Sequence, residues 1–357
     1  MKVVVVLPRD RLPFINEELS LVKTIYSQIV ETVVVKKANP RTYLSEEKLE
    51  KISGLDFDKL VVMDQLRPVQ LINLLRFLKR DVIDRMMLIL EIFAEHAGSK
   101  EAVLQIELAR LRYYLPLVKE AIRYAKLGEL HGFLGAGRYG YEKYYLMLRR
   151  REARVRRELE RLAETRSIRR KARREKGFYH VAIAGYTCAG KTTLFNALTG
   201  LSKPVGPEPF TTLSPKSAKI VFKGLDIILT DTVGFIRDLP PEIVDAFYAT
   251  LEEISYSDMV IDVVDSSKPR EEIINEVSTS LEVFSRLGVV GPNIIIALNK
   301  IDLTKDVNES MEAVREVVGE KYPVVPISAL RKYGISNLLE KVAEMLSSAS
   351  RERGVRT

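Results

Sequence analysis

The sequence predicts an α/β protein with a small parallel α/β domain at the N-terminus, a basic helical connector, and a C-terminal domain whose mostly parallel sheet is flanked by helices. Three observations predict this class. Valine-rich runs alternate with helical patterns in the first third, cations concentrate in a helical middle segment, and a second alternation of strands and helices follows. We expect the three parts to span residues 1–125, 126–176 and 177–357.

Short apolar runs, rich in valine, are separated by helical patterns in the first third of the chain. Strands are expected at Val3–Leu7, Thr32–Lys36 and Leu60–Met63, with helices at Glu17–Val30 and Ser45–Ile52. Strands that alternate with helices favour parallel pairing. Beyond this point the pattern predicts helices only, at Val69–Lys79, Arg85–His96 and Lys100–Leu127.

The middle of the chain is helical and strongly basic. The helix expected at Lys100–Leu127 carries apolar residues at alternating spacings of four and three, which is typical of a helix packed along another helix. A glycine-rich loop is expected at Gly132–Tyr141, followed by a helix at about Glu142–Lys176. Residues 143–176 hold 15 Lys and Arg against 5 Asp and Glu, a net charge of +10 in a chain whose total is +8. The basicity is therefore local.

The composition excludes several protein classes. A single cysteine, Cys188, excludes an internal disulfide framework and a multi-cysteine zinc site. No apolar run approaches the ~18 residues that span a bilayer. The opening Met1–Pro8 has too short an apolar run for a signal peptide and has no small-residue cleavage site. We expect a monomeric, cytoplasmic protein without stable membrane insertion.

A phosphate-binding loop is predicted directly after a strand pattern at Tyr179–Ala184. Residues 185–192 read Gly-Tyr-Thr-Cys-Ala-Gly-Lys-Thr and precede a helix pattern, which matches G-x-x-x-x-G-K-[ST] in its required setting. Backbone amides and the helix N-terminus would face the phosphates. Lys191 is expected to reach the β- and γ-phosphates and the Thr192 hydroxyl to bind Mg²⁺, the alternative being a chance glycine-rich loop. The expected contact residues are Gly185, Tyr186, Thr187, Cys188, Ala189, Gly190, Lys191, Thr192 and Thr193.

Two further segments are expected to complete the phosphate end of the site. Asp231 ends an apolar strand at Leu225–Leu229 and is expected to face Mg²⁺ through water, while the Gly234 amide meets the γ-phosphate. Thr212, in preference to Thr211, is expected to bind Mg²⁺ and the γ-phosphate and to be released when that phosphate is lost. The alternative is that both threonines are ordinary loop residues. The expected metal ligands are Thr192, Thr212 and Asp231, and the expected catalytic residues are Lys191, Thr212 and Gly234.

A fourth segment predicts recognition of guanine. A strand pattern at Asn293–Leu298 leads into Asn299-Lys-Ile-Asp302, whose terminal carboxylate offers two acceptors in one plane. Guanine presents two matching donors, N1–H and the 2-amino group, whereas adenine would leave the carboxylate unpaired. Lys300 is expected to lie against the base, and Asn299 to tie this loop to the phosphate loop. Backbone amides of Ser328, Ala329 and Leu330, after a strand pattern at Val324–Ile327, are expected at guanine O6.

The order of these motifs resembles the translation-factor-like class of P-loop GTPases and, within it, the HflX family. Besides the phosphate loop and Asp231-Thr-Val-Gly-Phe, the resemblance is carried by two runs that begin at Asp84 and Leu104. These read Asp-Arg-Met-Met-Leu-Ile-Leu-Glu-Ile-Phe-Ala-Glu-His-Ala and Leu-Gln-Ile-Glu-Leu-Ala-Arg-Leu-Arg-Tyr-Tyr-Leu-Pro-Leu. The resemblance covers most of the chain. It implies a family-specific N-terminal domain, a helical connector and a G domain, with nucleotide-dependent binding to the large ribosomal subunit and GTP hydrolysis as the release step.

Three departures qualify what the resemblance implies. Phe235 follows Gly234 where many GTPases carry a glutamine that orients water, and because a phenyl ring cannot do so we expect slow intrinsic hydrolysis. Cys188 stands where bacterial relatives carry asparagine; since a thiol is a poor ligand for K⁺, we expect no potassium activation. Two interpretations of Cys188 stay open: its thiol pKa is lowered by the nearby helix N-terminus and Lys191, or it is simply a small residue that fills space. The Gly132–Tyr141 loop lacks the Gly-Glu-Thr-Gln-Leu-Glu continuation of those relatives.

The basic helix at residues 143–176 suggests an anionic partner. Arginine favours bidentate contact with phosphate, so ribosomal RNA of the large subunit is the expected target, and a solvated helix face is the alternative. An anionic membrane is a competitor, although bulky aromatics are lacking on the outer face. The leading hypothesis is a ribosome-associated GTPase. Its rivals are a slow or non-hydrolysing GTP/GDP-gated RNA-binding regulator and a GTPase that docks on a membrane or an enzyme partner.

Overall fold

The computed structural model describes residues 1–126, 138–175, 177–201, 216–238, 251, 253–289 and 293–354. Within these residues the chain folds as two compact units, Met1–Leu162 and Ala163–Thr357, which are described separately. The three-part division expected from the sequence stays a prediction, because residues 127–137 and 176 lie outside the described residues. None of the described helices is long and apolar enough to cross a bilayer.

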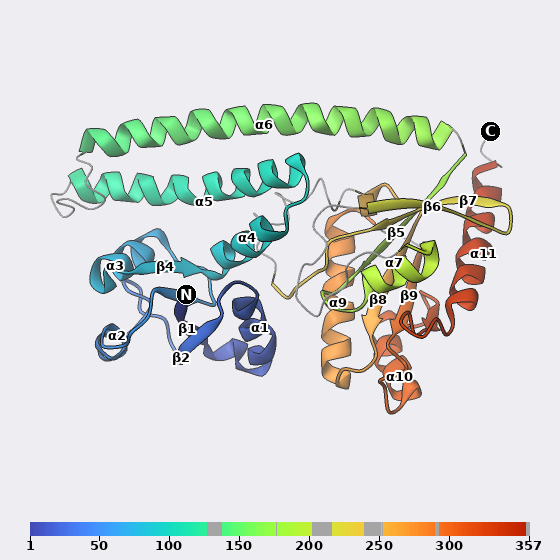
Figure 1. Cartoon of the computed structure of the whole chain (residues 1–357), viewed down its shortest axis with the longest axis horizontal. Helices are drawn as coiled ribbons and strands as arrows, with labels where there is room; N and C mark the ends of the chain where they lie inside the picture. The colour runs from blue at the N-terminus through green and yellow to red at the C-terminus, as the bar shows by residue number, and fades with distance from the viewer. Residues whose placement is uncertain are drawn as a thin grey trace. The chain divides into compact units, whose positions relative to one another are not determined.

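The first unit contains a four-stranded parallel sheet in the order β2-β1-β3-β4 (Figure 1). Its strands are β1 (Lys2–Pro8), β2 (Gln28–Val35), β3 (Lys59–Val62) and β4 (Asp81–Asp84). The apolar runs of β1 and β3 are almost entirely buried, as expected of central parallel strands covered on both faces. The parallel α/β architecture predicted from valine-rich runs is therefore confirmed.

The expectation that strands end at Met63 is wrong, because β4 pairs with β3 as a fourth strand. This strand has four residues with an aspartate at each end, so no apolar run marks it. Asp84 also caps the next helix by accepting a hydrogen bond from the Met87 amide. The helices of the sheet domain are a 3-10 helix (Arg9–Phe14), α1 (Ile15–Ile25), α2 (Glu46–Ser53), α3 (Pro68–Leu78) and α4 (Arg85–His96).

Two long helices, α5 (Lys100–Lys126) and α6 (Arg138–Glu175), lie side by side (Figure 1). The leucine seam predicted on α5 is buried, and its partner is α6, which contributes Leu148 and Val155 to the same cluster. Helix α6 begins at Arg138, so the last four residues of the loop expected at Gly132–Tyr141 are helical instead. Gly140 lies in the first turn of this helix. A glycine in a helix costs only about 1 kcal/mol relative to alanine, so the helix tolerates it.

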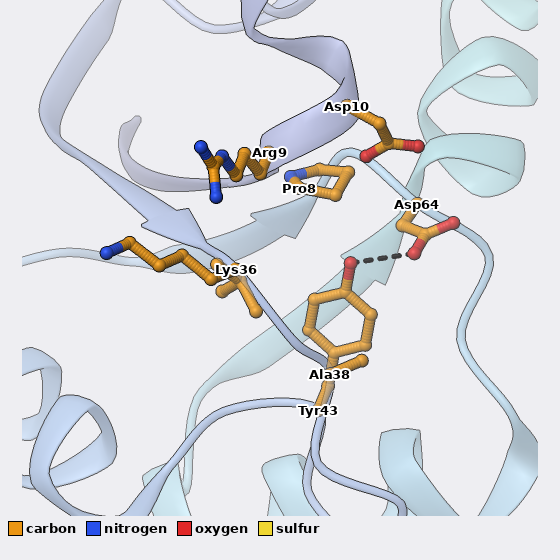
Figure 2. Close-up of a pocket in the computed structure, with 8 residues that line it drawn as sticks. Pro8, Arg9, Asp10, Lys36, Ala38, Tyr43 and Asp64 are labelled. Carbon is orange, nitrogen blue, oxygen red and sulfur yellow. Dashed lines mark hydrogen bonds between the residues drawn. The ribbon is translucent and has the colours of Figure 1, made fainter.

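The carboxyl ends of β1, β2 and β3 border a cavity of about 550 Å³. Figure 2 shows Arg9 and Lys36 on one side of it and Asp10 and Asp64 on the other. The hydroxyl of Tyr43 donates a hydrogen bond to Asp64 over 2.7 Å. Cations and carboxylates line the cavity in equal number, so its charge favours neither an anionic nor a cationic ligand.

The second unit contains a six-stranded sheet in the order β10-β9-β8-β5-β7-β6. All neighbouring strands are parallel except β6 and β7, which form an antiparallel edge. The prediction of a mostly parallel sheet is therefore confirmed. The strands are β5 (Tyr179–Gly185), β6 (Lys216–Phe222), β7 (Leu225–Asp231), β8 (Met259–Asp265), β9 (Ile294–Asn299) and β10 (Val324–Pro326).

Helices cover both faces of this sheet, because alternate residues of the central strands belong to different cores. Val181 and Ile183 of β5 pack in one core with side chains from α7 and α11, whereas Ala182 and Ala184 pack in the other with α9 and α10. The carboxyl ends of β5, β7, β8 and β9 therefore lie at one edge, where α/β sheets bind ligands. The helices are α7 (Lys191–Thr199), α9 (Arg270–Arg286), α10 (Val307–Val318) and α11 (Ile335–Gly354).

Candidate functional site

The predicted phosphate loop connects β5 to α7 at the carboxyl edge of the second sheet (Figure 1). Gly190 caps α7 with a φ of 97°, a conformation that favours glycine. Lys191 is 7% exposed, and its ammonium donates a hydrogen bond to the carbonyl of Tyr186, 2.6 Å away. Burial lowers the pKa of Lys191, and the carboxylate of Asp231 acts in the opposite direction. The loop thus folds around its own lysine at a helix N-terminus, an arrangement that suits an anion.

The segment after β7 lies against this loop, as the motif order predicts. The Thr187 amide donates to the Phe235 carbonyl over 2.7 Å, and the Phe235 amide donates to the Gly185 carbonyl over 3.0 Å. A Cβ atom on Gly234 would lie 2.8 Å from the ammonium nitrogen of Lys191. The same Cβ atom would lie 2.9 Å from the Cα atom of Thr187, so position 234 has room only for glycine.

Oxygen ligands suitable for Mg²⁺ meet at the start of α7. The Thr192 hydroxyl donates to an Asp231 carboxylate oxygen over 3.1 Å, and both side chains are buried. A hydroxyl and a carboxylate of this kind are hard ligands that Mg²⁺ accepts, so the residues present fit the predicted metal. The third predicted ligand, Thr212, lies outside the described residues, as does Thr211.

Asn299 links the phosphate loop to the segments predicted to bind the base. Its side-chain amide donates to the Ala189 carbonyl over 2.8 Å and accepts from the Ala329 amide over 2.9 Å. A Cβ atom on Gly190 would lie 2.3 Å from the side-chain nitrogen of Asn299, so the two loops are in direct contact. Three segments that are far apart in the sequence therefore meet at one buried side chain.

The remaining predicted base contacts lie on the two loops that Asn299 joins. Lys300 has a φ of 67°, and its ammonium lies 2.6 Å from a carboxylate oxygen of Asp265. Asp302 is exposed to solvent, as is Leu330, whereas Ser328 is completely buried. The carboxylate of Asp302 is therefore accessible at the edge of the sheet, close in sequence to the buried Asn299.

Asp265 was missed at the level of sequence, although a signal for it was present. It ends the apolar strand β8 as Asp231 ends β7, and it is 3% exposed. Besides the ion pair with Lys300, its carboxylate accepts hydrogen bonds from the backbone amide and the hydroxyl of Ser267. Asp265 therefore positions the lysine that is predicted to lie against the base.

Three protein-family profiles match successive parts of the chain. The profile described as GTP-binding GTPase N-terminal matches residues 14–94, and that described as GTP-binding GTPase Middle Region matches residues 96–173. The third, described as 50S ribosome-binding GTPase, matches residues 180–300 and thus contains the phosphate loop, Asp231 and Asn299.

Curated relatives match over nearly the whole chain. The chain is 42% identical to the GTPase HflX of Hyperthermus butylicus, with 96% of both chains covered. It is 39% identical to the GTPase HflX of Saccharolobus solfataricus, over 94% of this chain and 97% of the relative. This chain belongs to the HflX family of GTPases. A solved structure of a GTP-binding protein from Sulfolobus solfataricus in complex with GDP is 33% identical, with a TM-score of 0.54, and covers 98% of this chain and 100% of its own.

Phe235 of this HflX family member is part of the hydrophobic core. It is 1% exposed, and its ring contacts that of Phe284 edge to face, with centroids 5.6 Å apart. Its side chain therefore packs in the core that includes α9. Cys188, by contrast, is exposed and has a φ of 61°. Its thiol lies at the surface of the phosphate loop.

A second carboxyl group of the HflX site lies beneath the phosphate loop and was not predicted. Asp262 of β8 is completely buried, and a Cβ atom on Gly185 would lie 3.0 Å from its carboxylate. Burial raises the pKa of Asp262 to about 7, an effect that Ser280 and Lys191 reduce and Glu276 increases. This carboxyl group thus changes charge near neutral pH.

The buried Asp262 makes the stability of the protein depend on pH. Because its folded pKa lies above the unfolded value, the folded state retains a proton that the unfolded state releases between about pH 4 and 7. The free energy of unfolding should fall across this range as pH rises, and level off above it. Asp262→Asn should remove this decline and stabilise the protein above pH 7 by on the order of 2 to 4 kcal/mol.

Urea unfolding at pH 5 and pH 8 measures this effect. Asp226→Asn, which changes a half-exposed carboxylate of the same sheet that pairs with Lys219, serves as the control and should follow the pH profile of the wild type. An Asp262→Asn variant with the same pH profile as the wild type would show that Asp262 is ionised throughout the range.

Proposed function

We propose that the protein is a GTP-binding and GTP-hydrolysing switch whose nucleotide lies across the carboxyl edge of the second sheet. The observation that carries this proposal is the pair of hydrogen bonds by which Asn299 joins the phosphate loop at Ala189 to the Ala329 amide. One side chain thereby fixes the distance between the phosphate and base ends of the site. Membership of the HflX family supports the assignment of GTP as the substrate.

At the phosphate end, the loop amides and Lys191 bind the β- and γ-phosphates. Thr192 and Asp231 are the residues that would hold Mg²⁺, which supplies positive charge against the charge that develops on the phosphates. The Gly234 amide binds the γ-phosphate and so senses its presence. Thr212 is proposed as the second sensor and completes the metal ligands.

At the base end, the Asp302 carboxylate accepts hydrogen bonds from guanine N1–H and the 2-amino group. Lys300, held by Asp265, lies along the base. Of the three predicted amides, that of Leu330 donates to guanine O6, because the amides of Ser328 and Ala329 already donate to Tyr333 and Asn299. An adenine nucleotide would place an acceptor against the carboxylate of Asp302 and leave it unpaired. The cost of this unpaired group is the reason that the site prefers GTP over ATP.

Asn299→Ala tests whether the two ends of the site depend on each other. The substitution removes one donor and one acceptor that reach Ala189 and Ala329, each worth about 0.5–1.5 kcal/mol. GTP and GDP affinity should both fall by about tenfold. Calorimetric titration measures this, with Asn308→Ala on the neighbouring helix as the control. Unchanged affinity for both nucleotides would contradict the linking role.

Hydrolysis should be slow in the isolated protein. The buried ring of Phe235 cannot orient the attacking water, so another group or the partner must supply that function. The same observation favours a second candidate function, a GTP/GDP-gated RNA-binding regulator that hydrolyses GTP too slowly for turnover to matter.

The proposed partner is the large ribosomal subunit. The family description of residues 180–300 names 50S ribosome binding, and the arginine-rich helix α6 supplies cations that suit ribosomal RNA. Binding is expected to be strongest with GTP, when the segment around Thr212 is ordered by the γ-phosphate, and to weaken after hydrolysis.

Two measurements test the switch and its rival. The protein is sedimented with large ribosomal subunits in its GTP-analogue, GDP and empty states, and GTP turnover is measured with and without subunits. Stronger co-sedimentation with the GTP analogue, together with stimulated turnover, is the expected result. Co-sedimentation without stimulated turnover would favour the regulator, and no co-sedimentation in any state would reject the ribosomal partner.

A further inference from the structure

The cations of α6 fall into two groups that the sequence alone does not separate. Arg149 and Arg156 both form ion pairs with Glu152, which is 6% exposed, and Arg151 pairs with Glu107 of α5. These arginines lie beside the face that buries Leu148 and Val155 against α5. They therefore serve the packing of the two helices.

A second group lies on the opposite face of α6. Lys143, Arg150, Arg154 and Arg157, called the cationic stripe from here on, are all exposed. Successive spacings of seven, four and three residues place them in one row along the helix. The row is about 21 Å long at 1.5 Å per residue.

None of the four members of the cationic stripe forms an ion pair within the described part of the chain, and the other residues on the same face between Lys143 and Arg157 are the uncharged Leu146, Met147 and Ala153. The carboxylate of Glu158, whose pKa Arg154 helps to lower, already forms an ion pair with Lys100 of α5. Like charges four residues apart on a helix destabilise it by about 0.2–0.5 kcal/mol. An anionic partner would convert this repulsion into attraction.

We propose that the cationic stripe is the surface by which α6 binds the phosphate backbone of ribosomal RNA, an inference that rests on the proposed ribosomal partner. Three of its four members are arginines, which bind phosphate oxygens through two parallel N–H donors. A row of cations along a rigid helix matches a row of phosphates and reads no base sequence. The ion-paired arginines beside α5 take no part in this contact.

An anionic membrane is the competing anionic surface, and the packing of α6 disfavours it. An interfacial helix inserts its apolar face among the lipids. The main apolar face of α6 is already occupied, because Leu148, Val155 and Leu159 pack against α5, which leaves Leu146 and Met147 exposed beside the stripe. The remaining charge attraction alone is worth about 1 kcal/mol per cation and falls steeply with salt.

Two variants of equal charge test the inference. The stripe variant R150Q/R154Q/R157Q and the paired variant R149Q/R151Q/R156Q each remove three positive charges from the same helix. Binding of the full-length protein, loaded with a GTP analogue, to purified large ribosomal subunits is measured over a range of salt concentrations. We expect the stripe variant to bind about 10- to 100-fold more weakly, with the slope of log K against log salt smaller by about 3. The paired variant should stay within about threefold of the wild type.

Two controls keep the result interpretable. Circular dichroism melting sets the assay temperature below the transition of both variants, since the paired variant loses contacts to α5. Guanine nucleotide affinity, which depends on the other unit, should be unchanged in the stripe variant. If both variants lose the same affinity, or the stripe variant binds as the wild type does, the inference is wrong while the ribosomal partner stands.

The remaining outcomes concern the partner itself. A wild-type protein that does not bind subunits in any nucleotide state would overturn both the inference and the proposed partner. Co-flotation of the wild type with phosphatidylserine vesicles, lost in the stripe variant while subunit binding persists, would assign the stripe to membranes and overturn the RNA contact.

Discussion

Lys191→Ala is expected to weaken binding of GTP and GDP by about 10²- to 10⁴-fold, because it removes two charge-assisted hydrogen bonds to phosphate worth about 1.5–3 kcal/mol each. The ammonium is buried in the phosphate loop, where burial already lowers its pKa. Its hydrogen bond goes to the neutral carbonyl of Tyr186, so the burial of its charge carries a desolvation cost. The bound phosphates repay this cost.

Calorimetric titration with GDP and GTP in Mg²⁺ measures the loss. Lys341→Ala, which removes a half-exposed lysine of the same unit that pairs with Glu344, is the matched control and should bind as the wild type does. The variant leaves Asp231 and Asp262 buried without the lysine, so circular dichroism checks that it is folded before the affinities are compared. Retention of wild-type affinity in Lys191→Ala would refute the assignment of the phosphate site.

Asp302→Asn is expected to reduce the preference for GTP over ATP by about 10²- to 10⁴-fold. The carboxylate accepts from two guanine donors, whereas an asparagine amide presents a donor in place of one acceptor. The side chain of Asp302 is exposed, so the substitution should leave the free energy of unfolding unchanged within about 0.5 kcal/mol. The loss therefore reports base recognition and not folding.

A nucleotide of complementary chemistry provides the internal control. Xanthine carries a carbonyl oxygen where guanine carries the 2-amino group, so the amide of the Asp302→Asn variant can donate to it. The variant should bind xanthosine triphosphate more tightly than the wild type does. Equal GTP affinity in the variant and the wild type, with no gain for the xanthine nucleotide, would show that Asp302 does not contact the base.

Most of the fold follows from local patterns in the sequence. The valine run of β1 has an environment that its residues already describe, since a central parallel strand buries every side chain. The seam on α5 likewise requires a partner helix, which α6 provides. Strand β4 could not be predicted, because its four residues Asp81–Asp84 form a strand only through pairing with β3. Tertiary context overrides local preference in so short an element.

Some residues of the candidate site could likewise be predicted from local patterns, whereas others depend on tertiary packing. The phosphate loop and Asp231 lie next to strands and helices whose patterns mark them, so their placement is a local matter. Asp262 is different. Its residue type in the middle of an apolar strand indicates neither its complete burial nor its raised pKa, because both depend on the loop and on α9 packed around it.

The sequence by itself determined the family, the two α/β units, and the motifs of the nucleotide site, because these depend on residue types at short fixed spacings along one chain segment. The tertiary structure alone decided that Asn299 joins segments 110 and 30 residues away, and which arginines of α6 are paired. Hydrogen bonds and ion pairs depend on distances of a few ångströms. Only the packing of helices and strands brings such distant residues that close.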